Sequence, residues 1–170
     1  MNITIRRFTE KDIPLKVKWI NTPEINRYLH YDLPLEEEKT RKWFESASKL
    51  ENRRDFIIEA DDVPCGLIGL LNIDKKNLKA ELYLALGETK FMKKGISSAA
   101  VSLLLKYGFG ELGLEKIYLY TETANIGAQR LFEKMRFRKE GVLESDLFYS
   151  GRWVDRCIYS AFRKDYVIEG

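Results

Sequence analysis

Residues 92–100 read Met92-Lys93-Lys94-Gly95-Ile96-Ser97-Ser98-Ala99-Ala100 and join an expected strand to an expected helix. The apolar run 82–86 precedes them, and the apolar run 99–109 continues them. The first turn of a helix carries backbone N–H groups without internal partners, and the positive end of its dipole attracts anions. Gly95 lets the backbone approach a ligand without a Cβ in the way, and two lysines add positive charge. The stretch therefore predicts a strand–turn–helix unit whose turn binds a pyrophosphate.

The spacing of this turn distinguishes it from two common phosphate loops. A Walker loop needs G-x-x-x-x-G-K-[ST] and a dinucleotide fingerprint needs G-x-G-x-x-G, and neither is present. The segment instead resembles the R/Q-x-x-G-x-G/A turn of the Gcn5-related N-acetyltransferase (GNAT) family, which holds the pyrophosphate of acetyl-coenzyme A. Met92 stands where that family has Arg or Gln, and Ser97 stands where it has Gly or Ala.

Two later segments strengthen the resemblance. Residues 125–137, NIGAQRLFEKMRF, resemble the family's N-x-x-[SA]-x-x-[LF]-[YF]-x-K-x-G-F, with Arg136 in place of the usual Gly. Residues 148–160 resemble the last hairpin of the RimJ/RimL-like branch, which includes bacterial spermidine acetyltransferases. Three ordered motifs are more specific than one, and the resemblance covers nearly the whole chain. It implies acetyl-CoA as cofactor. It also implies cofactor contacts at Leu84, Ala85, Leu86, Met92, Lys93, Lys94, Gly95, Ile96, Ser97, Ser98, Asn125, Ala128 and Phe132.

Length and composition suit a single domain over residues 1–170 with a sizeable core. The formal net charge of +3 comes without a basic block, so nucleic-acid binding has little support. The chain has no apolar run long enough for a bilayer and no secretory signal pattern, so we expect no membrane partner and a cytoplasmic location. Two cysteines are too few for a disulfide framework or a metal cluster, and no metal is expected. The resemblance to the RimJ/RimL-like branch implies a homodimer.

Hydrophobic periodicity and turn residues give the order β-αα-βββ-α-β-α-ββ. Strands are expected near 3–5 and at 55–60, 66–73, 79–86, 116–121, 138–143 and 154–162. A short helix is expected to begin at a Thr9–Asp12 capping box and to run through Trp19. Further helices are expected over residues 35–50, 98–112 and 126–135. The helix over 35–50 is expected to bury Thr40, Trp43, Phe44, Ala47 and Leu50. This order predicts an α+β domain with a mixed, mostly antiparallel central sheet flanked by helices. The family resemblance implies the same order, with splayed central strands that admit the pantetheine arm.

Acetyl transfer from a thioester to an amine needs a base for the amine proton and benefits from an acid for the thiolate. Glu81 opens the strand before the phosphate turn and is the best candidate base, although a strand-end glutamate facing solvent is the alternative. Many GNAT enzymes have, at the position of Phe132, a tyrosine that acts as the general acid. Either another tyrosine serves, with Tyr120, Tyr149 and Tyr28 conceivable, or the thiolate leaves without an acid.

Substrate contacts are expected from Trp19, Glu24 and Tyr28 in the loop between the first helices and from Tyr149 in the last hairpin. The single histidine, His30, is either a substrate-site residue or an ordinary loop residue, and one histidine excludes credible Ser-His-Asp chemistry. The sequence thus predicts an acetyl-CoA-dependent N-acetyltransferase acting on a protein N-terminus or on a small amine such as a polyamine or amino sugar. A non-catalytic acyl-CoA-binding module is the alternative, favoured by Phe132 and Met92.

Overall fold

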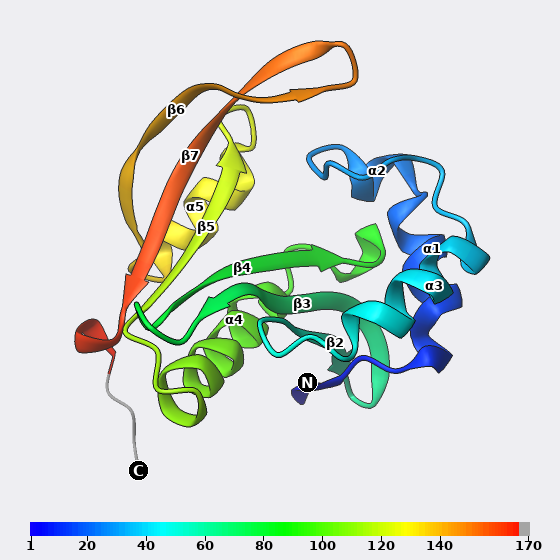
Figure 1. Cartoon of the computed structure of the whole chain (residues 1–170), viewed down its shortest axis with the longest axis horizontal. Coiled ribbons are helices and arrows are strands. Elements are labelled where there is room, and N and C mark those ends of the chain that lie inside the picture. Colours follow the sequence, from blue (N-terminus) through cyan, green and yellow to red (C-terminus); the bar gives the residue numbers. More distant parts are fainter. Residues whose placement is uncertain (167–170) are drawn as a thin grey trace.

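The computed structural model of the chain describes residues 1–166 and contains a seven-stranded sheet (Figure 1). The order across the sheet is β1-β2-β3-β4-β5-β7-β6, and every neighbouring pair is antiparallel except β4 and β5. The strands are β1 (Ile3–Arg7), β2 (Arg54–Ala60), β3 (Val63–Asp74), β4 (Lys79–Leu86), β5 (Lys116–Glu122), β6 (Arg138–Tyr149) and β7 (Arg152–Phe162). The predicted α+β class and the mixed, mostly antiparallel sheet are confirmed.

The two parallel strands at the centre separate soon after they meet. The pairing of β4 with β5 is confined to Lys79–Glu81 against Lys116–Tyr118. Beyond Glu81, β4 continues to Leu86 with only β3 beside it, and Figure 1 shows the two arrows diverging. The expected splay is confirmed, and it leaves one backbone edge of residues 82–86 without a strand partner.

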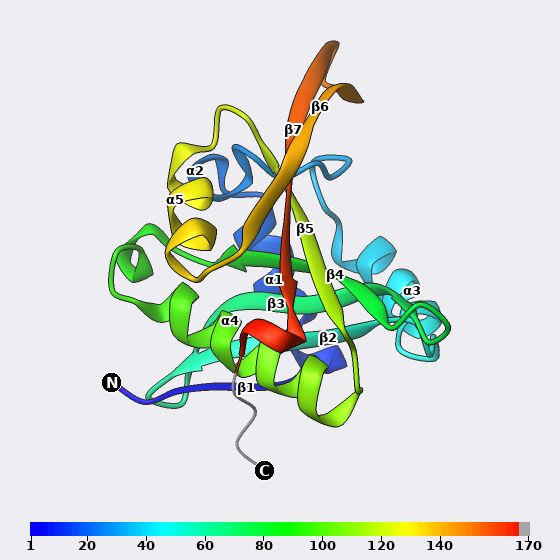
Figure 2. The same cartoon turned by 90° about the vertical axis from the view of Figure 1, so that its left-hand side faces the viewer.

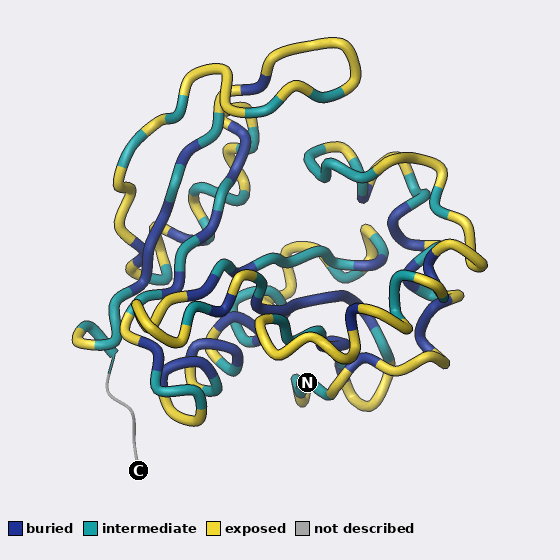
Figure 3. The backbone as a smooth tube through the Cα atoms, viewed as in Figure 1, coloured by how far each residue is buried: buried dark blue, intermediate teal, exposed yellow. Residues whose placement is uncertain are grey.

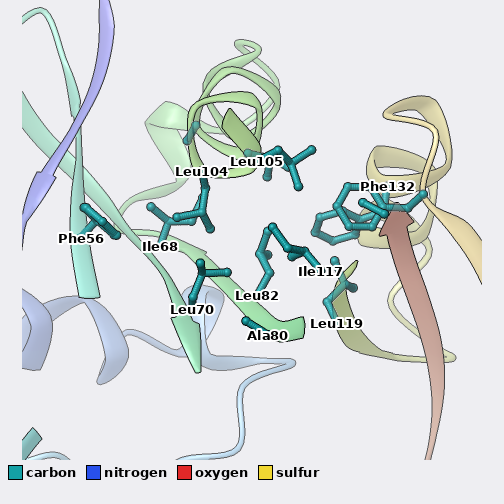
Figure 4. Close-up of a cluster of buried hydrophobic side chains, with 14 of the residues drawn as sticks. Phe56, Ile68, Leu70, Ala80, Leu82, Leu104, Leu105, Ile117, Leu119 and Phe132 are labelled. Carbon is teal, nitrogen blue, oxygen red and sulfur yellow. The ribbon is translucent and has the colours of Figure 1, made fainter. Parts of the chain in front are cut away.

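Helices cover both faces of the sheet. On one face lie α1 (Ile13–Ile20) and α3 (Glu37–Ala47), and on the other lie α4 (Ile96–Lys106) and α5 (Ile126–Lys134). Strand residues alternate between the two cores, because successive side chains of a strand point to opposite faces. Ile57 and Leu67 join the core under α1, whereas their neighbours Ile58 and Ile68 join the core under α4. Figure 4 shows the latter cluster, which continues across β4 and β5 to Phe132.

The helix boundaries differ from the expected ones in informative places. Helix α3 ends at Ala47, so the expected inward position of Leu50 is wrong, and this side chain is 50% exposed in the turn that follows. The Thr9–Asp12 capping box is confirmed, with the Thr9 N–H donating to Asp12 Oδ2 at 2.8 Å. A short helix, α2 (Pro23–Asn26), follows α1 and was not expected, because four residues carry too little periodicity to be recognised.

The last hairpin is longer than expected. Strand β6 runs to Tyr149 and β7 begins at Arg152, where the sequence pattern had suggested strand ends at residues 143 and 154. The β6–β7 register shifts between Leu143 and Leu147, a bulge that interrupts the alternation on which strand prediction depends. The hairpin therefore projects beyond the rest of the sheet (Figure 2).

Candidate active site

A cavity of about 390 Å³ lies at the turn between β4 and α4. Gly95 is the N-cap of α4 with a φ of +77°, a left-handed conformation that glycine adopts without strain. A Cβ built on Gly95 would have no neighbouring atom within 4 Å, so the space in front of the helix start is open. The cavity is lined by Leu86, Phe91, Lys93, Gly95, Ile96, Ser97, Ser98, Gly127, Arg130, Leu131 and Lys134.

Three cationic side chains face this cavity. Lys93 comes from the turn itself, and Arg130 and Lys134 lie one turn apart on α5, which puts them on one side of that helix. Within residues 1–166, none of the three forms an ion pair. Free cations beside an open helix N-terminus are what a pyrophosphate group requires. From the sequence alone neither Arg130 nor Lys134 is distinguishable from an ordinary cation on a helix surface.

A second cavity, of about 230 Å³, occupies the splay between β4 and β5. Its walls are β4, β5 and α5, and the loop after α2 covers it. Leu131 lines both cavities, so they adjoin. The lining residues are Tyr28, Leu29, His30, Glu81, Leu82, Tyr83, Leu84, Leu119, Tyr120, Thr121, Glu122, Asn125, Ala128, Leu131, Phe132 and Arg156.

Asn125 and Phe132 hold the α5 wall of the splay cavity in place. The Asn125 side chain caps α5 by accepting a hydrogen bond from the Ala128 N–H at 3.1 Å. Phe132 is 4% exposed and packs edge-on against Phe137, with 5.1 Å between the ring centroids. The wall is therefore rigid and apolar around position 132.

Glu81 and Tyr120 are two titratable groups that line this cavity from opposite strands. Burial raises the pKa of the Glu81 carboxyl, and Arg156 together with a 3.4 Å hydrogen bond from Asn72 Nδ2 opposes that shift. Burial also raises the pKa of Tyr120, and the nearby Glu81 carboxylate raises it further. At neutral pH the site thus presents a carboxylate that takes up protons more readily than usual and a phenol that stays protonated.

His30 and Glu122 form a pair that sequence reasoning missed. His30 Nε2 lies 2.8 Å from Glu122 Oε1, and Glu122 is only 4% exposed. The guanidinium of Arg152 lies 3.5 Å from the same oxygen. Alternation along β5 could have placed Glu122 on the face of Tyr118 and Tyr120. Its meeting with His30 depends on chain segments about ninety residues apart.

Comparison with known proteins agrees with this geometry. Residues 2–138 match the sequence model of the acetyltransferase (GNAT) domain. The chain belongs to the GNAT acetyltransferase family. It is 27% identical to N-acetyltransferase p20 of Bacillus licheniformis, whose function is uncharacterised, over 96% of this chain and 94% of that protein. It is 29% identical to spermidine N(1)-acetyltransferase of Escherichia coli K12, over 70% of this chain and 63% of that protein.

The fold also matches a solved enzyme of this family. The crystal structure of spermidine N-acetyltransferase from Vibrio cholerae, in complex with CoA and spermine, superposes with a TM-score of 0.88 at 25% identity, covering 95% of this chain and 96% of that one. Acetyl-CoA is the acetyl donor of the GNAT family, and this chain is an N-acetyltransferase. The open helix start, the three cations and the unpaired edge of β4 all fit a bound acetyl-CoA.

The GNAT domain brings most of the expected cofactor residues to the two cavities. Leu84, Asn125, Ala128 and Phe132 line the splay cavity, and Leu86, Lys93, Gly95, Ile96, Ser97 and Ser98 line the turn cavity. Ala85 pairs with Leu67 of β3 and lines neither cavity. Met92 and Lys94 are exposed beside the turn and also lie outside both linings.

The expected substrate residues separate in the structure. Tyr28 lines the splay cavity, whereas Glu24 is exposed on α2 outside it. Tyr149 lies outside the lining, and its hydroxyl donates to the Tyr31 carbonyl at 2.7 Å.

The expected role of Trp19 is wrong, because this side chain is 1% exposed in the last turn of α1. Its indole packs on Gly87, where a Cβ would come within 2.3 Å of the ring. Trp19 therefore supports the end of β4 from the core instead of meeting a substrate on a loop. The helix pattern of α1 was too short to show which of its side chains faces inward.

Membrane-spanning helices are not found among residues 1–166, since none of the helices there is long and apolar enough to cross a bilayer.

Proposed function

We propose that this GNAT domain transfers the acetyl group of acetyl-CoA to a primary amine by direct attack within a ternary complex. The acceptor is a protein N-terminus or a small amine such as a polyamine or an amino sugar. The observation that carries the proposal is the position of Glu81, half-buried in the splay cavity that adjoins the cationic turn cavity. A cofactor seated on the turn and a base for the amine thereby fall on one continuous path.

Acetyl-CoA supplies an acyl group that its thioester already activates, so the protein's task is placement and electrostatics. The amides of residues 93–98 and the cations Lys93, Arg130 and Lys134 hold the phosphates. The unpaired edge of β4 over residues 82–86 offers backbone N–H and C=O groups to the amides of the pantetheine arm. One of the same N–H groups donates to the developing oxyanion.

Glu81 accepts a proton from the bound ammonium, directly or through one water, and the neutral amine then attacks the thioester carbonyl. Burial suits it to that role, because a raised pKa makes the carboxylate a stronger base.

Tyr120 supplies the hydroxyl that Phe132 lacks. It lines the same cavity as Phe132, and within the described residues its hydroxyl makes no hydrogen bond. The other two tyrosines considered, Tyr28 and Tyr149, donate to the carbonyls of Ala124 and Tyr31. Tyr120 is therefore the tyrosine free to protonate the departing thiolate, which favours an enzyme over a passive acyl-CoA-binding module.

A panel of acceptors tests the proposal, with release of free CoA thiol as the readout. The panel contains spermidine, an amino sugar and a short peptide with a free N-terminus, each with acetyl-CoA. We expect turnover on at least one of these amines and a loss of 10²-fold or more in kcat for Glu81→Gln on the same amine. Tight CoA binding without thiol release on every amine would instead support the passive module.

A further inference from the structure

His30 and Glu122 close the acceptor cavity at the end away from Glu81. Both residues line that cavity, His30 from the loop after α2 and Glu122 from the end of β5. In Figure 1 the α2 segment and the tip of the β6–β7 hairpin lean over the opening between β4 and β5. The imidazole is thus supplied by a loop, and the carboxylate that it meets is supplied by the sheet.

The neighbours of His30 fix the plane of its ring. The ring meets Tyr149 edge-on, with 5.1 Å between centroids and an interplanar angle of 78°. Tyr149 is itself held by the hydrogen bond from its hydroxyl to the Tyr31 carbonyl, at 2.7 Å. A ring held by a carboxylate on one nitrogen and an aromatic side chain beside it is oriented before any ligand arrives.

The contact with Glu122 also decides which ring nitrogen carries the proton. An ionised carboxylate only accepts hydrogen bonds, so Nε2 must be the donor in the 2.8 Å contact. Arg152 lies 3.5 Å from the same carboxylate oxygen and shares its negative charge. In a neutral imidazole whose proton is on Nε2, the lone pair is on Nδ1. Nδ1 is then a lone-pair acceptor, and within residues 1–166 no side chain or backbone N–H donates to it.

Glu81 and Glu122 are too far apart to serve one nitrogen atom. Glu81 is in register with Tyr118, and Glu122 lies four residues further along β5, about 13 Å at 3.3 Å per residue. Tyr118, Tyr120 and Glu122 alternate onto one face, so the cavity has a proton acceptor at each end of this face. An acceptor molecule whose amine reacts beside Glu81 would present its far end to His30.

Building on the proposed function, we propose that His30 is a specificity residue for the acetyl acceptor. Its Nδ1 accepts a hydrogen bond from a second N–H or O–H group of the acceptor, several bonds away from the reacting amine. Glu122 acts through His30 as a positioning residue, because it holds the ring in the Nε2–H tautomer. The enzyme thereby prefers bifunctional acceptors, diamines or amino alcohols, to simple alkylamines of the same length.

Steady-state kinetics with matched probes test this preference. The probes are 1,6-diaminohexane, 6-amino-1-hexanol and 1-aminohexane, which share one chain length and differ only at the far end. For His30→Phe, which keeps a planar ring beside Tyr149, we expect KM to rise about 10-fold for the two bifunctional probes, as for the loss of one hydrogen bond to a charged or polar group. KM for 1-aminohexane and kcat for all three should change less than twofold.

Arg27→Gln is the matched control, because it removes a charge from the same loop at an exposed position. We expect Arg27→Gln to leave the preference between the probes intact. Equal effects of His30→Phe on all three probes would overturn the proposal and assign the ring to packing. Turnover that persists on 1-aminohexane would at the same time leave the acetyltransferase activity itself standing.

A spectroscopic test is independent of turnover, since the chain contains a single histidine. On protein freed of any histidine tag, the ¹⁵N shifts and ring couplings of the imidazole report which nitrogen is protonated. We expect the Nε2–H tautomer near pH 8, a shift of the Nδ1 signal on adding 1,6-diaminohexane with CoA, and no such shift with 1-aminohexane. Glu122→Gln should mix the two tautomers. A doubly protonated ring, or the Nδ1–H tautomer, contradicts the proposal.

Discussion

The environment of Glu81 has opposite consequences for catalysis and for stability. If this carboxylate takes the amine proton, Glu81→Gln lowers kcat by about 10²- to 10³-fold near neutral pH. At higher pH more of the amine is already neutral, so the variant partly recovers. The pH profiles of kcat for the two proteins measure this effect. The surface variant Glu45→Gln is the control, and a Glu81→Gln profile parallel to that of the wild type would make Glu81 a strand residue only.

The stability of the same variant should move in the other direction. Burial raises the pKa of Glu81 above its value of about 4.3 in an unfolded chain. Between these two pKa values the folded protein holds the proton more tightly, so the free energy of unfolding falls as pH rises through that window. The loss is complete once the pH exceeds the raised pKa. Glu81→Gln should therefore have a higher Tm than the wild type at pH 8 and a smaller advantage at pH 4, measured by thermal denaturation.

Tyr120 is expected to act only in the departure of the thiolate. Tyr120→Phe should lower kcat about 10- to 100-fold and leave the affinity for CoA unchanged. Tyr118→Phe is a matched control, because Tyr118 shares its face and its proximity to Glu81 but does not line the cavity. Adding Phe132→Tyr to Tyr120→Phe puts a hydroxyl back into the same cavity and should restore part of kcat. No change in kcat for Tyr120→Phe would mean that the thiolate leaves without this acid.

Lys16 is a buried cation outside the active site. Its ammonium lies 3.5 Å from the centroid of the Trp43 ring, and burial lowers its pKa to about 8, with Asp55 opposing and Arg53 reinforcing the shift. Because the unfolded chain binds this proton up to about pH 10.4, Lys16 makes the free energy of unfolding rise between pH 8 and 10.4, by about 3 kcal/mol. Lys16→Met should lack that rise. Urea unfolding of both proteins at pH 7 and pH 10 measures the difference, and equal pH dependence would contradict the shift.

At the level of elements, sequence patterns predicted the features that depend on neighbouring residues in the chain. The strand 79–86, the glycine turn and the following helix combine an apolar run, a glycine and a helix start within thirty residues, and all three appear in place. The hairpin ends and the burial of Trp19 depend instead on a bulge in β6 and on contact with Gly87. Those features arise between elements, so no window of sequence contains them.

The turn between β4 and α4 makes a prediction that belongs to this element. Gly95→Val would place a branched side chain at a φ of +77°, strained by about 1–2 kcal/mol, and would project it into the open space before α4. We expect the affinity for CoA, measured by calorimetry, to fall at least 10-fold. Gly113→Val is the matched control, with a φ of +65° and equally open space but no place in the cavity lining. If both variants lose stability and neither loses affinity for CoA, the pyrophosphate does not bind at this turn.

At the scale of the whole molecule, the sequence predicted residues in the two walls of the site, β4 and α5, but not the contacts of the loop that covers it. Glu81 and Asn125 follow from motifs on neighbouring elements, whereas His30, Glu122 and Arg152 meet from three distant segments. In the sequence, charged residues whose partners lie far along the chain cannot be distinguished from ordinary surface residues. Their partners are set only when β5, β7 and the loop after α2 are packed together.

The assembled surface leaves one edge of the sheet that a second copy of the chain would cover. Strand β6 is twelve residues long and ends the strand order, and long edge strands are prone to pairing. Phe148 and Trp153 near its turn are 59% and 64% exposed, with 5.0 Å between their ring centroids. Figure 3 shows much of β6 and the tip of the hairpin as exposed.

We therefore expect a homodimer that buries this hairpin. The double variant Phe148→Glu with Trp153→Glu should shift the mass to that of a monomer in light scattering at micromolar concentration, because facing carboxylates repel and apolar burial is lost. Val63→Glu, at an apolar position 53% exposed at the start of β3, serves as the control and should stay dimeric. A wild-type monomer would contradict the dimer. A double variant that stays dimeric would move the interface elsewhere, and the bare edge of β1 would then be the next surface to test.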